Sequence, residues 1–94
     1  MGATIKISFD EAKRQWTLEQ RGLDFADAVK IFAGDYLEFI DDRYDYGEDR
    51  YIVYGELDAR TVVIVWTPRG GTRRVISMRH VHDEELKDCR RALD

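Results

Sequence analysis

The side chains best suited to chemistry are the basic residues near the end of the chain. Residues 60–80 carry no acidic residue and five arginines, which gives this segment a charge of +5 with histidine neutral: Arg60, Arg69, Arg73, Arg74 and Arg79. Guanidinium groups bind phosphates and other oxyanions through paired N–H donors. We therefore expect this segment to bind an anion.

One reaction fits an inventory of basic and acidic side chains alone. Cleavage of RNA by its own 2′-hydroxyl needs a base for that proton, a cation for the pentavalent phosphate and an acid for the leaving oxygen. Arginine, lysine, histidine and glutamate supply all of these without metal or cofactor. The sequence contains no Walker motif, dinucleotide fingerprint, metal-binding helix motif or Ser-His-Asp order that would favour another reaction.

Arg79 is the best candidate for this chemistry, because it ends a predicted strand beside His80 and His82. The alternative is structural: Arg79 pairs with Glu84 or Glu85 and holds the last predicted helix. Residue type alone favours the structural interpretation.

Four neighbouring residues are candidate RNA contacts: Arg69, Arg73, Arg74 and His80. The arginines could hold phosphates, and a histidine titrates near neutral pH. Arginines beside a hairpin turn more often form a solvated edge, however, and most surface histidines have no special role.

Lys13 and Arg21 add two cations from the first predicted helix. They are eight residues apart, which is about two turns, so they lie near one face of that helix. An ordinary exposed helix surface is the alternative interpretation.

The elements that must position these side chains are four strands in a row. Apolar alternation predicts strands over Tyr36–Ile40 and Arg50–Leu57, then a hairpin from Thr61 to His80 that turns at Pro68–Gly71. The first hairpin strand is apolar on both alternate faces, as in an interior strand. In the second hairpin strand, simple alternation predicts two faces that both carry arginine. One face has Arg74, Ile76 and Met78, and the other has Arg73, Val75, Ser77 and Arg79.

Helices fill most of the remaining chain. A strand over Thr4–Phe9 leads into a helix that Asp10 caps and Gly22 ends. Asp24 begins a second helix, with Asp27 in the acidic place of a capping box and an apolar stripe along it: Phe25, Ala28, Val29 and Phe32. A third helix follows Asp83, with Leu86, Cys89 and Leu93 on one face.

The predicted order is β-α-α-β-β-β-β-α, an α+β fold in which an antiparallel sheet packs against helices. The 94 residues fit one domain, 1–94, and 44% are hydrophobic. The N-terminus lacks a signal-peptide core and no stretch spans a bilayer, so we expect a cytoplasmic protein. A single cysteine, Cys89, predicts neither an internal disulfide nor a zinc site.

The net charge of −4 conceals a strongly acidic segment. Residues 35–59 carry nine acidic residues against Arg43 and Arg50, which gives −7. Residues 41–49, DDRYDYGED, have no periodicity and are predicted to form an exposed acidic loop. Such a loop would attract a basic partner in preference to RNA.

Four stretches in register give the chain a resemblance to a known family. They are residues 9–13 (FDEAK), 21–28 (RGLDFADA), 47–51 (GEDRY) and 74–79 (RVISMR). Together they resemble the BrnT family of bacterial toxins, in the RelE/ParE-like superfamily, from Phe9 to about Glu85. The resemblance implies a metal-independent ribonuclease toxin that degrades RNA and inhibits growth. It also implies a BrnA-type antitoxin with a ribbon-helix-helix DNA-binding domain, and repression of the operon by the complex.

Carried over from the family, the residues of its active site fall on Lys13, Arg50 and Arg79. The family's Gly-Glu-x-Arg-Tyr glutamate falls on Glu48. The family has Lys-His-Gly at the end of the first helix, where this chain has Gln20-Arg21-Gly22, so an arginine replaces a titrating histidine.

Three classes of function remain open at this stage. The first is a ribonuclease toxin, and the second is a catalytically weakened toxin homologue that binds its antitoxin and regulates the operon. The third is an unrelated small α+β interaction module.

Overall fold

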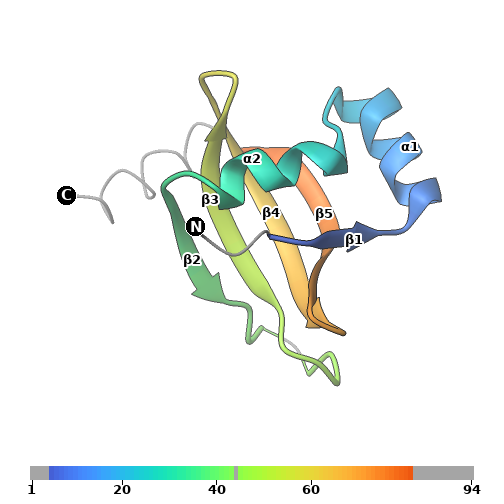
Figure 1. The fold of residues 1–94 in the computed structure, drawn as a ribbon, viewed down its shortest axis with the longest axis vertical. Helices are drawn as coiled ribbons and strands as arrows, with labels where there is room; N and C mark the ends of the chain where they lie inside the picture. The colour runs from blue at the N-terminus through green and yellow to red at the C-terminus, as the bar shows by residue number, and fades with distance from the viewer. Residues whose placement is uncertain (1–4, 44, 82–94) are drawn as a thin grey trace.

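Five strands form one mixed sheet in the order β1-β5-β4-β3-β2 (Figure 1). The computed structural model describes residues 5–43 and 45–81, so the helix predicted after Asp83 lies outside the described residues. The strands are β1 (Ile7–Phe9), β2 (Tyr36–Ile40), β3 (Tyr51–Leu57), β4 (Arg60–Arg69) and β5 (Thr72–His80).

The predicted meander is confirmed, because β2, β3, β4 and β5 pair in sequence order and antiparallel. The prediction of a wholly antiparallel sheet is wrong, since β1 pairs with β5 in parallel, Ile7 opposite Arg73. The physical reason is the helical segment that follows β1. It carries the chain across the sheet before β2 begins, so β1 takes the edge that β5 leaves open.

Two tight turns join the last three strands. Asp58 and Ala59 have φ angles of 51° and 64°, and Gly70 and Gly71 have φ angles of 57° and 79°. Two successive left-handed residues match the twist of a hairpin, and glycine adopts them without strain. β4 lies in the middle of the sheet, with Val62 and Val63 on alternate faces exposed by only 0% and 2%. The predicted interior strand is therefore confirmed.

A β-bulge changes the faces of β5. Val65 lies opposite Ser77 but Trp66 lies opposite Val75, so Ile76 is an extra residue. Val75 and Met78 consequently both reach the core beneath the helices, which we call the helix face. The alternation predicted across Ile76 is wrong for this reason.

The arginines nevertheless lie on both faces of the sheet, as predicted. Arg73 shares the helix face with Val75, and its guanidinium contacts a helix residue, Phe32. Arg74 and Arg79 pair with Thr67 and Val63, which belong to the other side, called here the opposite face.

The first helix forms as predicted. α1 (Glu11–Arg21) is capped by Asp10, whose side chain accepts a hydrogen bond from the Ala12 N–H at 3.3 Å. Gly22, with φ of 68°, ends it by donating its backbone N–H to the carbonyl of Leu18. Only Thr17 of this helix is buried. The helix is 11 residues long, and no helix in the described part of the chain is long and apolar enough to cross a membrane.

The second predicted helix is divided into a 3-10 turn, η1 (Phe25–Asp27), and α2 (Ala28–Phe32). Asp24 caps the turn through the Ala26 N–H at 2.9 Å. A 3-10 turn has three residues per turn, so it rotates the apolar stripe that follows. Ile31 is buried and Val29 is 37% exposed, which corrects the prediction for Val29.

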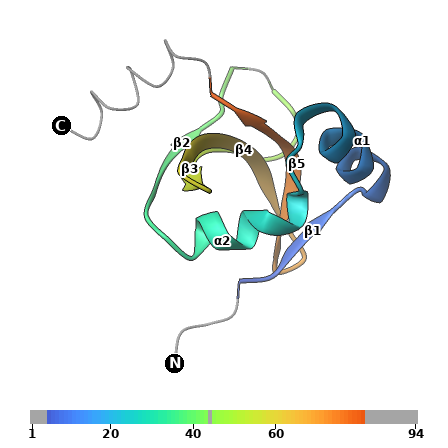
Figure 2. The ribbon, with the colours of Figure 1, turned by 90° about the horizontal axis from the view of Figure 1, so that it is seen from above.

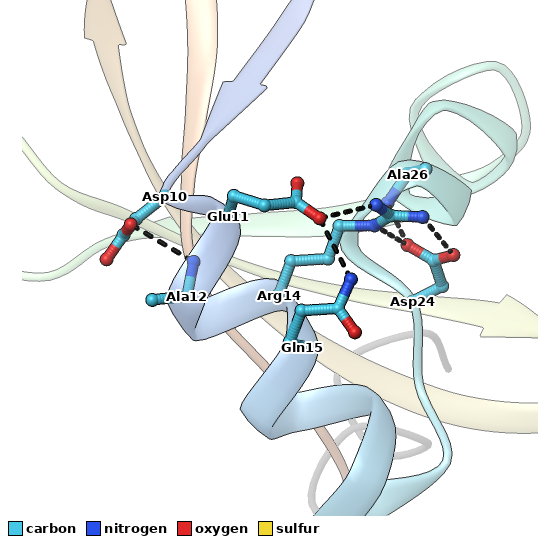
Figure 3. A network of polar contacts seen from close by, with 7 residues as sticks. All are labelled: Asp10, Glu11, Ala12, Arg14, Gln15, Asp24 and Ala26. Atoms are coloured by element: carbon cyan, nitrogen blue, oxygen red, sulfur yellow. Dashed lines mark hydrogen bonds and ion pairs between the residues drawn. The ribbon is translucent and has the colours of Figure 1, made fainter.

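Arg14 joins the two helical segments (Figure 3). Its guanidinium donates to both carboxylate oxygens of Asp24, at 2.8 and 3.1 Å, and to Glu11 at 2.8 Å. The pKa of Asp24 is lowered by these bonds first and by its bond from Ala26 second. This network holds α1 at the β5 side of the sheet, while α2 crosses over the sheet (Figures 1 and 2).

Candidate functional site

α1 directs a stripe of three residues towards β5. Lys13, Thr17 and Arg21 follow at intervals of four, so they lie on one side of the helix. Thr17 is 3% exposed, and Arg21 donates from Nη1 to the carbonyl of Met78 in β5 at 2.9 Å. Lys13 is exposed and makes no hydrogen bond or ion pair to a described residue. The helix therefore presents an available amine beside β5.

The Arg21 guanidinium makes two contacts within the chain, one to a carbonyl and one to an aromatic ring. Besides its bond to Met78, the group lies 5.1 Å from the ring centroid of Trp16, which is 53% exposed. A cation over an indole face is attracted by the ring quadrupole. Arg21 thus links the end of α1 to β5. Trp16 stays exposed and lies about one helical turn from Lys13.

Arg79 lies near the end of β5, on the opposite face. Its Nη1 donates to the carbonyl of His80 at 3.3 Å, which turns the guanidinium towards the strand end. Glu84 and Glu85, its partners in the structural interpretation, lie outside the described residues, so that interpretation stays a prediction.

His80 points to the helix face, where it pairs across the sheet with Val62. Its pKa is lowered, first by burial and then by the charge of Arg60, with the Arg21 backbone offsetting part of the effect. The imidazole is therefore mostly uncharged at pH 7, and any RNA contact it makes is a neutral hydrogen bond.

Arg50 and Arg69 meet at the other end of the sheet through a carboxylate. Glu48 accepts from Arg69 Nη2 at 3.0 Å and from Arg50 Nη2 at 3.5 Å. The Arg50 guanidinium also lies 3.9 Å from the ring centroid of Tyr46. The pKa of Glu48 is lowered, chiefly by Arg69. Glu48 thus occupies the position that a phosphate would take between two arginines.

Arg73 and Arg74 are adjacent in sequence but have different surroundings. The Arg73 guanidinium is held between Phe32 and Trp66, 4.6 and 4.7 Å from the ring centroids, and donates to the hydroxyl of Tyr36 at 3.1 Å. Arg74 lies on the opposite face and makes no hydrogen bond or ion pair to a described residue. Arg73 therefore stabilises the core, and Arg74 is available to an anion.

The candidate residues form two groups along β5. Arg69 and Arg74 lie near the turn between β4 and β5. Arg50 lies at the same end of the sheet, because the next residue, Tyr51, pairs with Trp66. Trp66 is adjacent to Thr67, which pairs with Arg74. Arg79 lies five residues beyond Arg74, roughly 15 Å along the strand. Lys13 flanks β5 from α1. The structure separates Arg73 and His80 from these groups, because both point to the helix face.

Sequence reasoning missed the role of Glu48 in this cluster. The available signal was an acid two residues before Arg50 in the segment 47–51. Its bond to Arg69 follows only from the pairing of β3 with β4, which brings the loop before β3 to the end of β4. Within residues 5–43 and 45–81, no three His, Cys, Asp or Glu side chains are grouped as metal ligands.

The fold and these side chains define a class: a small α+β domain with arginines on the opposite face of its sheet. A family model for the ribonuclease toxin BrnT of type II toxin–antitoxin systems matches residues 9–85. The chain therefore belongs to the BrnT family of ribonuclease toxins. A type II system pairs its toxin with a protein antitoxin, so a protein partner is part of this identity. A comparison with curated proteins found no match.

Proposed function

We propose that this chain is an RNA endonuclease of RelE/ParE-like fold, which cleaves its substrate without a metal ion and so inhibits translation and growth. The observation that carries the proposal is that Arg74 and Arg79 lie on the opposite face of the sheet, with Arg50 just before β3 and Lys13 on α1, the helix that contacts β5. Arginine and lysine at these positions match the residue types that phosphate-ester cleavage requires.

In the proposed reaction the 2′-hydroxyl loses its proton to a base, the 2′-oxygen bonds to phosphorus, and the 5′-oxygen leaves with a proton from an acid. Arginine keeps its proton in proteins, so Arg79 is assigned to the charge of the pentavalent phosphate and Arg50, which lies towards the other end of β5, to a neighbouring phosphate of the RNA. Lysine can exchange its proton, so Lys13 is assigned to proton transfer. Arg21, Arg69 and Arg74 would contact the RNA on either side, whereas Arg73 supports the sheet and His80 points to the helix face.

Induced expression in a bacterial host tests this assignment. Wild-type protein should stop growth and degrade RNA, and Arg79→Ala should lower the cleavage rate by about 10²- to 10⁴-fold. Arg50→Ala should lower it less, through weaker RNA binding. Arg60→Ala is the matched control, because Arg60 is exposed and pairs with Leu57 on the helix face. Purified enzyme should keep its activity in a chelator. Intact RNA and normal growth with the wild-type chain would rule out the nuclease.

The proposed partner is a BrnA-type antitoxin with a ribbon-helix-helix DNA-binding domain, through which the complex represses its own operon. The family supports this proposal, since its members are toxins of type II systems. The adjoining reading frame provides the test. It should encode a short protein with one strand and two helices, and that protein should bind this chain and then operator DNA.

A catalytically weakened homologue that regulates the operon is the second candidate. Two observations favour it: Arg21 is bonded to Met78, and Arg50 is bonded to Glu48 and stacked on Tyr46. Both cations are thus occupied in the free protein. This candidate predicts that antitoxin binding and operon repression persist while RNA stays intact.

A further inference from the structure

The strand at the far end of the sheet, β2, has an outer edge with which no strand of the described residues pairs. Two of its five side chains are large, apolar and exposed: Phe39 by 47% and Ile40 by 71%. Native sheets usually protect such an edge, because its unpaired N–H and C=O groups accept another strand. The outer edge of β2 can therefore pair with an added strand of about five residues.

Free negative charge lies at both ends of this edge. Asp35 precedes β2 and Asp42 follows it, and both are exposed and make no hydrogen bond or ion pair to a described residue. Two carboxylates in or beside β2 have partners within the chain. Asp41 pairs with Arg43 at 2.8 Å, and Glu38 accepts from Trp66 Nε1 at 3.1 Å.

This charge discriminates among the molecules that could cover the edge. The segment from 35 to 59 carries −7, which repels RNA. A second copy of the chain would bring the same acidic segment against itself, and like charges across an interface cost binding energy. A basic peptide segment is attracted where RNA and a second copy are repelled. Its positive side chains neutralise Asp35 and Asp42, and its backbone pairs with the strand between them.

We infer that the outer edge of β2 binds an extended basic segment of the protein antitoxin as an added strand. The inference rests on the antitoxin partner of the family and deepens the proposed function. Main-chain hydrogen bonds would supply much of the affinity and the alternate side chains the specificity. The segment has an apolar side chain towards Phe39 on one face, another towards Ile40 on the other, and lysine or arginine at each end.

β2 and α1 lie at opposite sides of the sheet (Figure 1). The added strand thus binds away from Lys13 and Arg79 and leaves the candidate site on β5 uncovered. Anchoring of the antitoxin and neutralisation of the toxin are then separate tasks, performed by different parts of the partner.

The test uses purified Arg79→Ala toxin and the antitoxin encoded by the adjoining reading frame. Ile40→Lys in this background should weaken binding at least tenfold by calorimetry, and Asp35→Lys with Asp42→Lys should do the same. Leu18→Lys is the matched control, because Leu18 is also exposed, by 39%, but lies on α1. It should leave affinity unchanged.

Hydrogen exchange gives a second readout that reports the strand itself. Outward amides of residues 36–40 should exchange rapidly in the toxin alone, and an added strand should slow their exchange strongly in the complex. Unchanged affinity of Ile40→Lys, or unchanged exchange at 36–40 in a formed complex, would overturn the inference.

Self-association is the competing outcome. If sedimentation shows that the toxin alone is a dimer and that Ile40→Lys makes it a monomer, then the edge binds a second copy and the inference is wrong. Loss of the nuclease proposal would not affect these measurements, because binding is measured in an Arg79→Ala background and needs no cleavage.

Discussion

The carboxylate of Glu48 pairs with the guanidinium of Arg69 at 3.0 Å, across 21 positions of sequence. The same carboxylate accepts a longer bond from Arg50. One acidic side chain therefore occupies two cations that the proposed function assigns to RNA.

Glu48→Gln should increase the affinity for RNA. Removing the carboxylate frees Arg50 and Arg69 for a phosphate, and exposed ion pairs of this kind are weak, so we expect a gain of roughly two- to fivefold. Fluorescence anisotropy with a short single-stranded RNA and the Arg79→Ala protein would measure it. Glu56→Gln is the control, since Glu56 is exposed and has no ion pair to a described residue. Weaker binding by Glu48→Gln would show instead that the carboxylate holds the arginines in their binding positions.

Arg73→Ala should lower stability, and Arg74→Ala should lower RNA affinity. Arg73 loses two aromatic contacts and a hydrogen bond, so its removal should lower the free energy of unfolding by about 1–3 kcal/mol. Arg74→Ala should change stability by no more than about 0.5 kcal/mol and should weaken RNA binding. Urea unfolding and anisotropy on the same two proteins separate the roles. Equal losses of stability would contradict the assignment.

Gly55→Ala should destabilise the fold through α2. A Cβ at Gly55 would collide with the Cγ2 methyl of Ile31, which a β-branched side chain in a packed helix cannot move aside. Overpacking of this kind costs about 1–3 kcal/mol. Gly34→Ala is the control, because the nearest atom to its added Cβ would be 3.7 Å away. Thermal unfolding of both variants should show a lower midpoint for Gly55→Ala alone.

Asp41 should make stability depend on acid pH. Hydrogen bonds from Arg43 and then Tyr46 help lower its pKa from 3.8 to about 2, against the opposing effect of burial. A carboxylate with a lowered pKa stabilises the fold fully above its unfolded value near 4, and this contribution is lost as pH falls towards 2. Asp41→Asn should therefore be less stable than wild type at pH 7, and the difference should shrink between pH 4 and pH 2. A difference that stays constant over this range would contradict the assignment.

Local patterns were enough to predict most of the elements. Asp10 and Gly22 mark the ends of α1, the alternation in residues 51–57 predicts β3, and the run that is apolar on both faces in residues 61–67 predicts β4 as an interior strand. The β1 partner was not predictable in the same way. Its pairing with β5 depends on the route of the whole intervening chain, which no local window contains.

The site was predictable only as a set of residue types. Adjacent arginines at 73 and 74 look equivalent in sequence, yet the pleat sends one between Phe32 and Trp66 and the other to the opposite face. The bulge at Ile76 then shifts every later residue of β5 by one position relative to β4. A bulge leaves no mark in residue type here, so the neighbours of Arg79 follow from the structure alone.

The parallel pairing of β1 with β5 has a consequence for the order of events during synthesis. β1 leaves the ribosome before the other four strands, and its partner strand is made only after β2, β3 and β4. Contacts between segments distant in sequence form late, so β2, β3 and β4 can pair before β1 pairs with β5. Arg79 lies in the same late strand. A nascent chain therefore carries no complete candidate site until β5 has emerged, and premature termination before that point should yield a harmless fragment.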